Sequence, residues 1–220
     1  MKALVSEALG TFALLFAGTG AIVINAASHG AIGHAGIAFT FGLIVMAMIY
    51  TFGDVSGAHL NPAVTVAFAV ARRFEWKAVP GYLVAQLTGA LAASSLLRVL
   101  FPQDTTHLGA TLPAGSAMQS FILEVVLTAM LMLTILSVST GAKEKGITAG
   151  IAIGGVIALE AMFAGPICGA SMNPVRSLAP ALVSGHLQHL WLYLTAPILG
   201  ALIAIPLCIA CRGTGEPGNR

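Results

Sequence analysis

The feature that most constrains this chain is a series of six apolar stretches, each about as long as a lipid bilayer is thick. They cover roughly residues 4–25, 32–53, 79–101, 117–139, 147–165 and 187–210. A helix needs about 20 mostly apolar residues to cross the hydrocarbon core, and in lipid it satisfies its backbone hydrogen bonds internally. We therefore predict an all-α membrane protein with six transmembrane helices.

Two shorter apolar stretches, about 61–71 and 173–184, are too short to cross the bilayer and too apolar for a loop in water. Stretches of about 10 to 14 residues are candidates for re-entrant segments. Each begins with Asn-Pro, and proline suits the first turn of a helix because its missing N–H would lack a partner there. We predict two re-entrant half-helices.

Charge excludes the soluble classes. Charged residues make up only 8% of the chain, against about 25% in a typical soluble domain. The 10 basic and 8 acidic residues leave a net charge of +2 without a basic run, which disfavours a nucleic-acid partner. The lipid bilayer is the expected environment, and the sequence shows no cofactor motif and no histidine or cysteine spacing that fits a metal.

The basic residues predict the orientation. Positive charge gathers on the cytoplasmic side of membrane proteins, and this holds if the N-terminus is cytoplasmic. Arg98, near the outer end of the third span, and Arg176, inside an apolar stretch, are the exceptions. We expect a multi-pass protein of the plasma (or bacterial inner) membrane with both termini in the cytoplasm. The residues on the inner side are Lys2, Arg72, Arg73, Lys77, Lys143, Lys145, Arg212 and Arg220.

The two halves of the chain repeat each other. Each half holds three spans and one half-helix, and because three is odd, the second half enters the membrane upside down. We expect one channel domain over 1–220 with an inverted 3+3 repeat, about 1–101 and 117–210, and a polar tail over 212–220. The matching pairs are Glu7 and Glu124, Thr11 and Thr128, Asn61 and Asn173, Tyr82 and Tyr193, and Gly89 and Gly200.

This topology brings both half-helix N-termini to the middle of the membrane. Each carries about half a positive charge from the helix dipole, and Asn61 and Asn173 add amide donors. Such a site disfavours cations and suits a neutral polar solute that offers oxygen lone pairs.

Ser56–Thr65 and Gly169–Ser177 resemble the two signature loops of the aquaporin (major intrinsic protein) family, and the resemblance covers nearly the whole chain. Phe41–Tyr50 and Phe163–Pro174 look most like the nodulin-26-like branch. The resemblance implies a homotetramer and a passive channel for water and small uncharged solutes such as glycerol and boric, silicic or arsenous acid, with protons and ions excluded. The signature residues carried over are Asn61, Pro62, Ala63, Asn173, Pro174 and Val175.

Arg176 is costly to place in a membrane, by about 3 kcal/mol on insertion scales, and no acidic residue lies in its own segment. We interpret it as a pore-facing group that donates to solutes and repels cations. The resemblance makes it the arginine of the family's selectivity filter, which spacing completes with Phe41, Ala161 and Ala170. Two alanines predict a wide opening. Val175 replaces the family's usual alanine and either narrows or reshapes the central constriction.

The sequence also suggests roles for four further side chains. Glu7 and Glu124 lie within spans at equivalent positions, and we expect them to accept backbone N–H groups of the re-entrant loops. Glu160 is expected at a subunit contact or near the pore. Cys168, placed in the outer loop, is a candidate site for inhibition by mercurials.

Alternatives to a channel of wide selectivity remain. A water-selective aquaporin and a secondary active transporter both fit the broken helices and inverted repeat. An adhesion role is a third alternative. An enzyme is disfavoured, because no Ser/His, Cys/His or paired-carboxylate arrangement is evident.

Overall fold

The computed structural model describes residues 1–139 and 143–212, apart from the side chains of 143–147 and 212. The polar tail lies outside the described residues from position 213 onward. The regular elements of the described residues are all helices, joined by loops and turns. They are α1 Lys2–Ala27, α2 Gly33–Ser56, α3 Pro62–Val70, η1 Trp76–Ala78, α4 Val79–Leu100, η2 His107–Gly109, α5 Ala117–Val138, α6 Lys143–Cys168, α7 Pro174–Ser184 and α8 Leu190–Arg212. The all-α prediction is confirmed.

Six of these helices are long and apolar enough to cross a membrane, as the sequence predicts. Their ends lie within a few residues of the expected ones, except that α6 extends from Lys143 to Cys168 rather than 147–165. Gly57 and Gly169 follow α2 and α6, with φ of 82° and 83°. Glycine adopts this left-handed conformation without steric cost and commonly ends helices. Both re-entrant loops therefore start in the same way.

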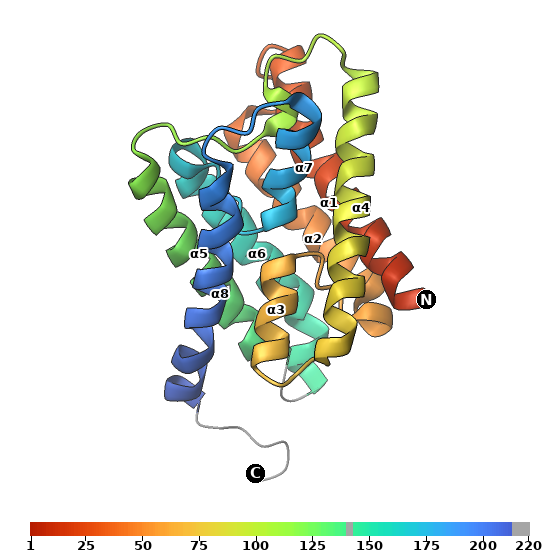
Figure 1. The fold of residues 1–220 in the computed structure, drawn as a ribbon, viewed down its shortest axis with the longest axis vertical. Helices are drawn as coiled ribbons and strands as arrows, with labels where there is room; N and C mark the ends of the chain where they lie inside the picture. The colour runs from red at the N-terminus through yellow and green to blue at the C-terminus, as the bar shows by residue number, and fades with distance from the viewer. Residues whose placement is uncertain (140–142, 213–220) are drawn as a thin grey trace.

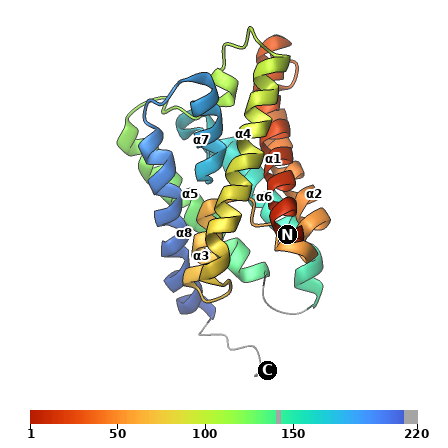
Figure 2. The ribbon, with the colours of Figure 1, turned by 45° about the vertical axis from the view of Figure 1, so that its right-hand side comes forward.

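The helices pack as two matching groups. In the first half α1 contacts α2 and α4, and in the second half α5 contacts α6 and α8. The halves meet where α2 packs against α6, and each short helix contacts long helices of the other half, α3 with α8 and α7 with α4. Figures 1 and 2 show α3 and α7 in opposite halves of the long axis, with their first turns towards the centre. This is the arrangement that the inverted repeat predicts.

Glycines at equivalent positions allow the helices to approach closely. A Cβ on Gly89 of α4 would collide with the carbonyl of Ala8, and one on Gly200 of α8 with the carbonyl of Val125. Small residues at such crossings let membrane helices pack backbone to backbone. The same contact thus occurs once in each half.

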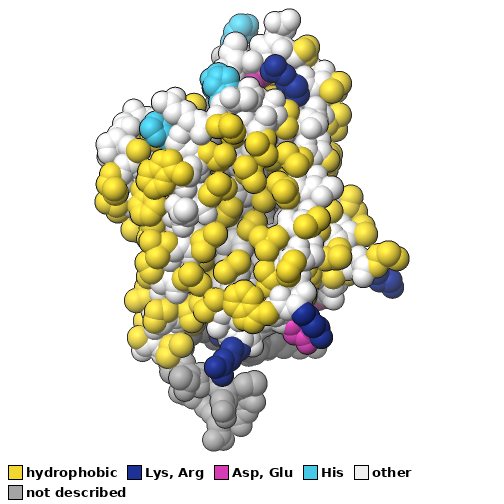
Figure 3. Space-filling view, in the orientation of Figure 1, with side chains coloured by type: hydrophobic (Ala, Val, Ile, Leu, Met, Phe, Trp, Pro, Cys, Tyr) yellow, Lys and Arg dark blue, Asp and Glu magenta, His cyan; other side chains and the backbone are white. Residues whose placement is uncertain are grey.

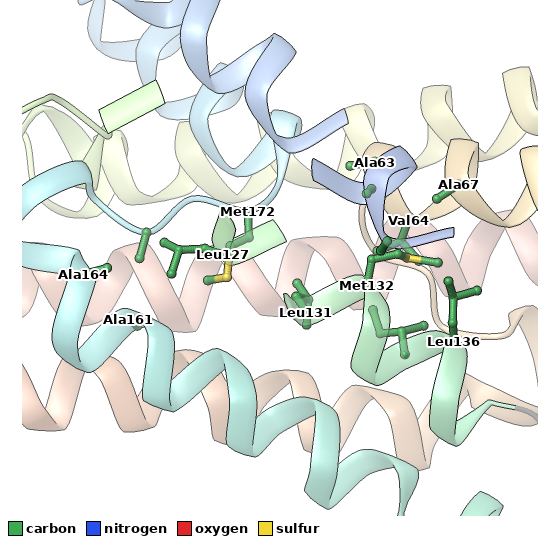
Figure 4. Close-up of a cluster of buried hydrophobic side chains, with 14 of the residues drawn as sticks. Ala63, Val64, Ala67, Leu127, Leu131, Met132, Leu136, Ala161, Ala164 and Met172 are labelled. Carbon is green, nitrogen blue, oxygen red and sulfur yellow. The ribbon is translucent and has the colours of Figure 1, made fainter. Parts of the chain in front are cut away.

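The outer face of the bundle is apolar. Large hydrophobic side chains such as Val84, Ile122 and Phe163 are more than half exposed, and Figure 3 shows hydrophobic atoms covering the middle of the molecule, with basic side chains towards its ends. Exposed apolar area of this extent marks contact with lipid or other subunits. Inside, a buried cluster joins α3, α5, α6 and the loop before α7 through residues that include Val64, Leu131 and Met172 (Figure 4).

Candidate pore and constriction

The two re-entrant loops share an unusual backbone. In addition to the glycines that open them, Ala58 and Leu60 in the first loop and Ala170 and Met172 in the second have positive φ angles between 41° and 53°. This conformation is unfavourable for residues with a Cβ, so surrounding contacts must hold it. Two buried carboxylates provide such contacts.

Glu7 of α1 accepts four hydrogen bonds around the first loop. Its Oε1 accepts from the Ser56 hydroxyl (2.8 Å) and the His59 backbone N–H (2.9 Å). Its Oε2 accepts from the Leu60 backbone N–H (2.7 Å) and the Gln86 side-chain amide (2.8 Å). The Glu7 side chain is fully buried, so these donors take the place of water.

Glu124 of α5 occupies the equivalent position in the second half. Its two carboxylate oxygens accept the backbone N–H groups of Ser171 (2.7 Å) and Met172 (2.8 Å). The Cys168 thiol lies beside it and donates to the Ala164 carbonyl at 3.5 Å. Each carboxylate thus accepts two backbone N–H groups from the loop of its own half.

Asn61 and Asn173 cap the two half-helices. The side-chain oxygen of Asn61 accepts from the Ala63 N–H (2.9 Å), and that of Asn173 from the Val175 N–H (3.2 Å). Proline follows each asparagine as the first helical residue. The sequence signal for a helix start was therefore specific at both places.

The same two amides also link the halves across the centre of the molecule. Asn61 Nδ2 donates to the Met172 carbonyl (2.7 Å), and Asn173 Nδ2 donates to the Leu60 carbonyl (2.9 Å). A side-chain amide carries two N–H donors. Each asparagine therefore keeps one N–H to offer to a solute.

Both asparagines line a cavity of about 650 Å³ that runs along the bundle. On α2 its wall extends from Phe41 to Asp54, and on α6 from Ala149 to Ala161. At 1.5 Å per residue these helix segments are about 20 Å long, most of the hydrocarbon thickness. The remaining wall is mostly apolar side chains such as Val45.

The four residues predicted to form the filter all line this cavity. The Arg176 guanidinium lies 4.9 Å from the centre of the Phe41 ring, and Arg176 is only 3% exposed. Ala161 and Ala170 present single methyl groups. The result is a wall with one cation, one aromatic face and two small side chains.

The partner of Arg176 was not visible in the sequence. Its Nη1 donates to the Gly109 carbonyl at 2.7 Å, whereas its Nε has no hydrogen-bond partner among the described residues. Gly109 belongs to η2 in the loop between α4 and α5, 67 positions away. Sequence reasoning assigned no role to Gln86 or to the paired Tyr82 and Tyr193. The two tyrosine hydroxyls donate to the carbonyls of Ser56 and Cys168, respectively, at 2.8 Å.

Three expectations differ from the structure. Cys168 ends α6 rather than lying in an outer loop, and its side chain is fully buried, so it lacks the exposure that a mercurial requires. Val175 packs with Leu14 and Ala90 and is not part of the cavity wall. Glu160 is fully buried, outside the cavity wall, and its oxygens have no partner among the described residues. Packing between the helices turns these three side chains away from the cavity.

Two short helices that meet at capped N-termini, beside a lengthwise cavity, define a membrane channel. The family described as Major intrinsic protein matches residues 1–207, and the chain belongs to this family.

Named relatives agree with this assignment. The chain is 44% identical to "Aquaporin NIP1-1" of Zea mays, over 99% of this chain and 77% of that protein. It is 43% identical to "Nodulin-26" of Glycine max, over 99% of this chain and 80% of that protein. Among solved structures it is similar to the aquaglyceroporin from Plasmodium falciparum, with a TM-score of 0.85, 27% identity and 94% of each chain covered.

Proposed function

We propose that this protein is a passive channel for water and small uncharged solutes, including glycerol and boric, silicic or arsenous acid. The observation that carries the proposal is the lengthwise cavity with two asparagine amides at its centre and Arg176 beside Phe41 at one level. Solute hydroxyl groups accept from these donors, while the apolar wall contacts the rest of the solute. The family membership and the NIP-type relatives support it.

Phe41, Ala161, Ala170 and Arg176 act as the selectivity filter in this proposal. The two alanines leave room for molecules larger than water, because each contributes only one methyl group. Phe41 offers an apolar surface and Arg176 a donor, which suits a solute with one polar edge. A water-selective filter would need a bulkier side chain here.

Ions are excluded by charge and desolvation together. Arg176 and the two half-helix N-termini place positive potential in the cavity, and stripping water from an ion is costly. The negative charge of Asp54 is distant from the filter, because Asp54 lines the other end of the wall, about 20 Å along α2 from Phe41 at 1.5 Å per residue. Protons are excluded as well, because a water molecule that accepts from Asn61 and Asn173 has no lone pair left to receive one.

Glu7 and Glu124 hold the re-entrant loops in this proposal, and their hydrogen bonds to loop N–H groups support that role. The protein assembles as a homotetramer with one pore per subunit, buried against lipid and its own copies through its exposed apolar faces. It resides in the plasma or inner membrane with both termini in the cytoplasm, as the distribution of basic residues favours.

A permeability panel in proteoliposomes tests the proposal. Stopped-flow light scattering measures water, glycerol, urea, boric acid and arsenous acid in matched vesicles with and without protein. We expect water, glycerol, boric acid and arsenous acid to pass, at rates that do not depend on pH gradients or sodium gradients. Passage of water alone would favour the water-selective alternative, coupling to a gradient would favour a transporter, and no permeability would favour an adhesion role.

A further inference from the structure

The two ends of the cavity carry opposite charges. Among the described residues that line it, Arg176 is the only lysine or arginine and Asp54 is the only acidic residue. Asp54 lies in the last turn of α2, which ends at Ser56, and its side chain is exposed. It is about 20 Å along the helix from Phe41 at 1.5 Å per residue, and Phe41 lies beside Arg176. The carboxylate therefore does not neutralise the cation at the filter.

The end of the cavity near Asp54 is a mouth formed by three helices. A Cβ on Gly150 of α6 would collide with the Tyr50 ring of α2, so the first half of α6 lies beside the last turns of α2 (Figure 2). Because Asp54 and Ser139, just after α5, are both exposed, the cavity opens to solvent here. The residues of this Asp54 mouth are Asp54, Val138, Ser139 and Ala149.

Helix stability does not explain a carboxylate at this position. The C-terminus of a helix carries partial negative charge, so an acidic side chain is unfavourable there. The last turn of α2 contains no basic residue, and Asp54 forms no ion pair within the described part of the chain. The end of α5 has the favourable arrangement instead, because the Arg73 guanidinium donates to the Leu136 carbonyl at 2.9 Å. A side chain that breaks a local rule in this way is typical of a functional position.

The filter and the half-helices do not oppose anions by charge. Arg176 and the two half-helix N-termini repel cations, but the same positive potential attracts anions. The N–H groups at helix N-termini are also donors that bind anions in proteins. Glu7 and Glu124 do not belong to the cavity wall, and their oxygens accept N–H groups of the re-entrant loops. Asp54 is therefore the charge that an anion in the passage meets.

We propose that Asp54 excludes anions from the channel, as Arg176 excludes cations, so that uncharged solutes are the class that passes both. An anion that enters through the Asp54 mouth meets the carboxylate first, and one that enters from the other end must leave past it. The exclusion therefore acts in both directions. This inference rests on the proposed function, because it gives Asp54 a part in the selectivity of the same passage.

Nitrate conductance across planar bilayers tests the inference. Asp54→Asn has nearly the same size as the wild-type side chain but no charge, and both proteins are reconstituted in equal amounts. We expect nitrate conductance to rise about fivefold in the variant, because the repulsion of a unit charge at a water-filled mouth is lost. If Asp54→Asn does not fold, Asp54→Ser removes the same charge.

Glu75→Gln is the matched control. Glu75 is an exposed carboxylate that pairs with Lys77 at 2.9 Å and lies outside the cavity wall. Removing its charge should leave nitrate conductance at the wild-type value. An equal rise in Glu75→Gln and Asp54→Asn would show that any acidic residue of the surface has this effect, and it would contradict a specific role for Asp54.

A second measurement separates charge from pore width. The Asp54 carboxylate attracts cations as well as repelling anions, so adding Asp54→Asn to the Arg176→Val channel should lower potassium conductance about threefold. A wider pore raises both conductances, whereas loss of the charge moves them in opposite directions. Unchanged nitrate conductance in Asp54→Asn, or a rise in the conductance of both ions, would overturn the inference. Absence of glycerol flux through the wild-type protein would instead contradict the proposed function.

Discussion

The loops before α3 and α7 have the same backbone but are supported by different side chains. In the first loop Glu7 accepts two backbone N–H groups together with the Ser56 hydroxyl and the Gln86 amide. In the second loop Glu124 accepts the two backbone N–H groups, with the weaker Cys168 thiol at the position of Ser56. Pro197, at the position of Gln86 in the repeat, has no side-chain donor. The first loop therefore has more side-chain support from its own half than the second loop has, in addition to the bond from the Asn173 amide to the Leu60 carbonyl.

The second loop is tied to the loop between α4 and α5 through buried side chains. Thr111 donates to the Ser177 hydroxyl at 2.7 Å, which bonds to the Ser171 hydroxyl at 2.6 Å, and Arg176 bonds to Gly109. At the position of Arg176, α3 has Val64. The comparison teaches that the inverted repeat duplicates the backbone, whereas selectivity depends on side chains that the repeat does not duplicate, such as Arg176.

The largest expected effect is on stability, and it differs between the carboxylates of Glu7 and Glu124. Glu7→Gln replaces one carboxylate oxygen, which accepts two of the four hydrogen bonds, with an NH₂ group that faces the same two donors. We expect this change to lower the free energy of unfolding by about 3 kcal/mol or more. Glu124→Gln should cost about half as much, because fewer donors surround it. Unfolding in detergent, followed by tryptophan fluorescence, measures both. Equal losses would show that the extra donors on Glu7 contribute nothing.

Arg176→Val removes the functional difference between the half-helices, since Val64 is the equivalent residue. We expect cation conductance across planar bilayers to rise about tenfold or more, because the fixed positive charge in a low-dielectric passage is gone. Val175→Ala, one residue away and outside the cavity wall, is the control and should not leak. Unchanged ion leakage in Arg176→Val would mean that Arg176 does not face the solute path.

Ala161→His narrows the filter without changing its charge at high pH. We expect glycerol and boric acid permeability to fall about tenfold while water falls less, because an added ring blocks larger solutes first. Ala149→His places the same ring on the same helix at the other end of the cavity wall and should discriminate less. The measurement is the ratio of solute to water rates in matched vesicles. An equal fall in all rates would contradict the wide-filter interpretation.

Cys168→Ser gives the second loop the hydroxyl that the first has in Ser56, and has the smallest expected effect. A stronger donor beside Glu124 should stabilise the protein by about 0.5 to 1 kcal/mol and leave permeability unchanged. Because the Cys168 thiol is buried, mercurials should act equally on wild type and variant. Inhibition lost in Cys168→Ser would show that the thiol is reached after all.

The sequence by itself determined the architecture. The bilayer requires long apolar helices with all backbone groups paired, so the six spans and the two half-helices could be predicted from length and composition. The Asn-Pro starts at Asn61 and Asn173 could be predicted because capping is a local property. Arg176 stood out because a cation in an apolar stretch is rarely without function. The family resemblance is confirmed by the match over residues 1–207.

Only the tertiary structure decided which side chains face the cavity and what holds them. Gly109 reaches Arg176 from 67 positions away, and no local pattern encodes that contact. Val175 and Glu160 turn away from the cavity wall because the packing of distant helices sets the rotation of each helix about its axis. Sequence spacing gives the relative angle between residues on one helix, but the direction of the cavity depends on the other helices around it.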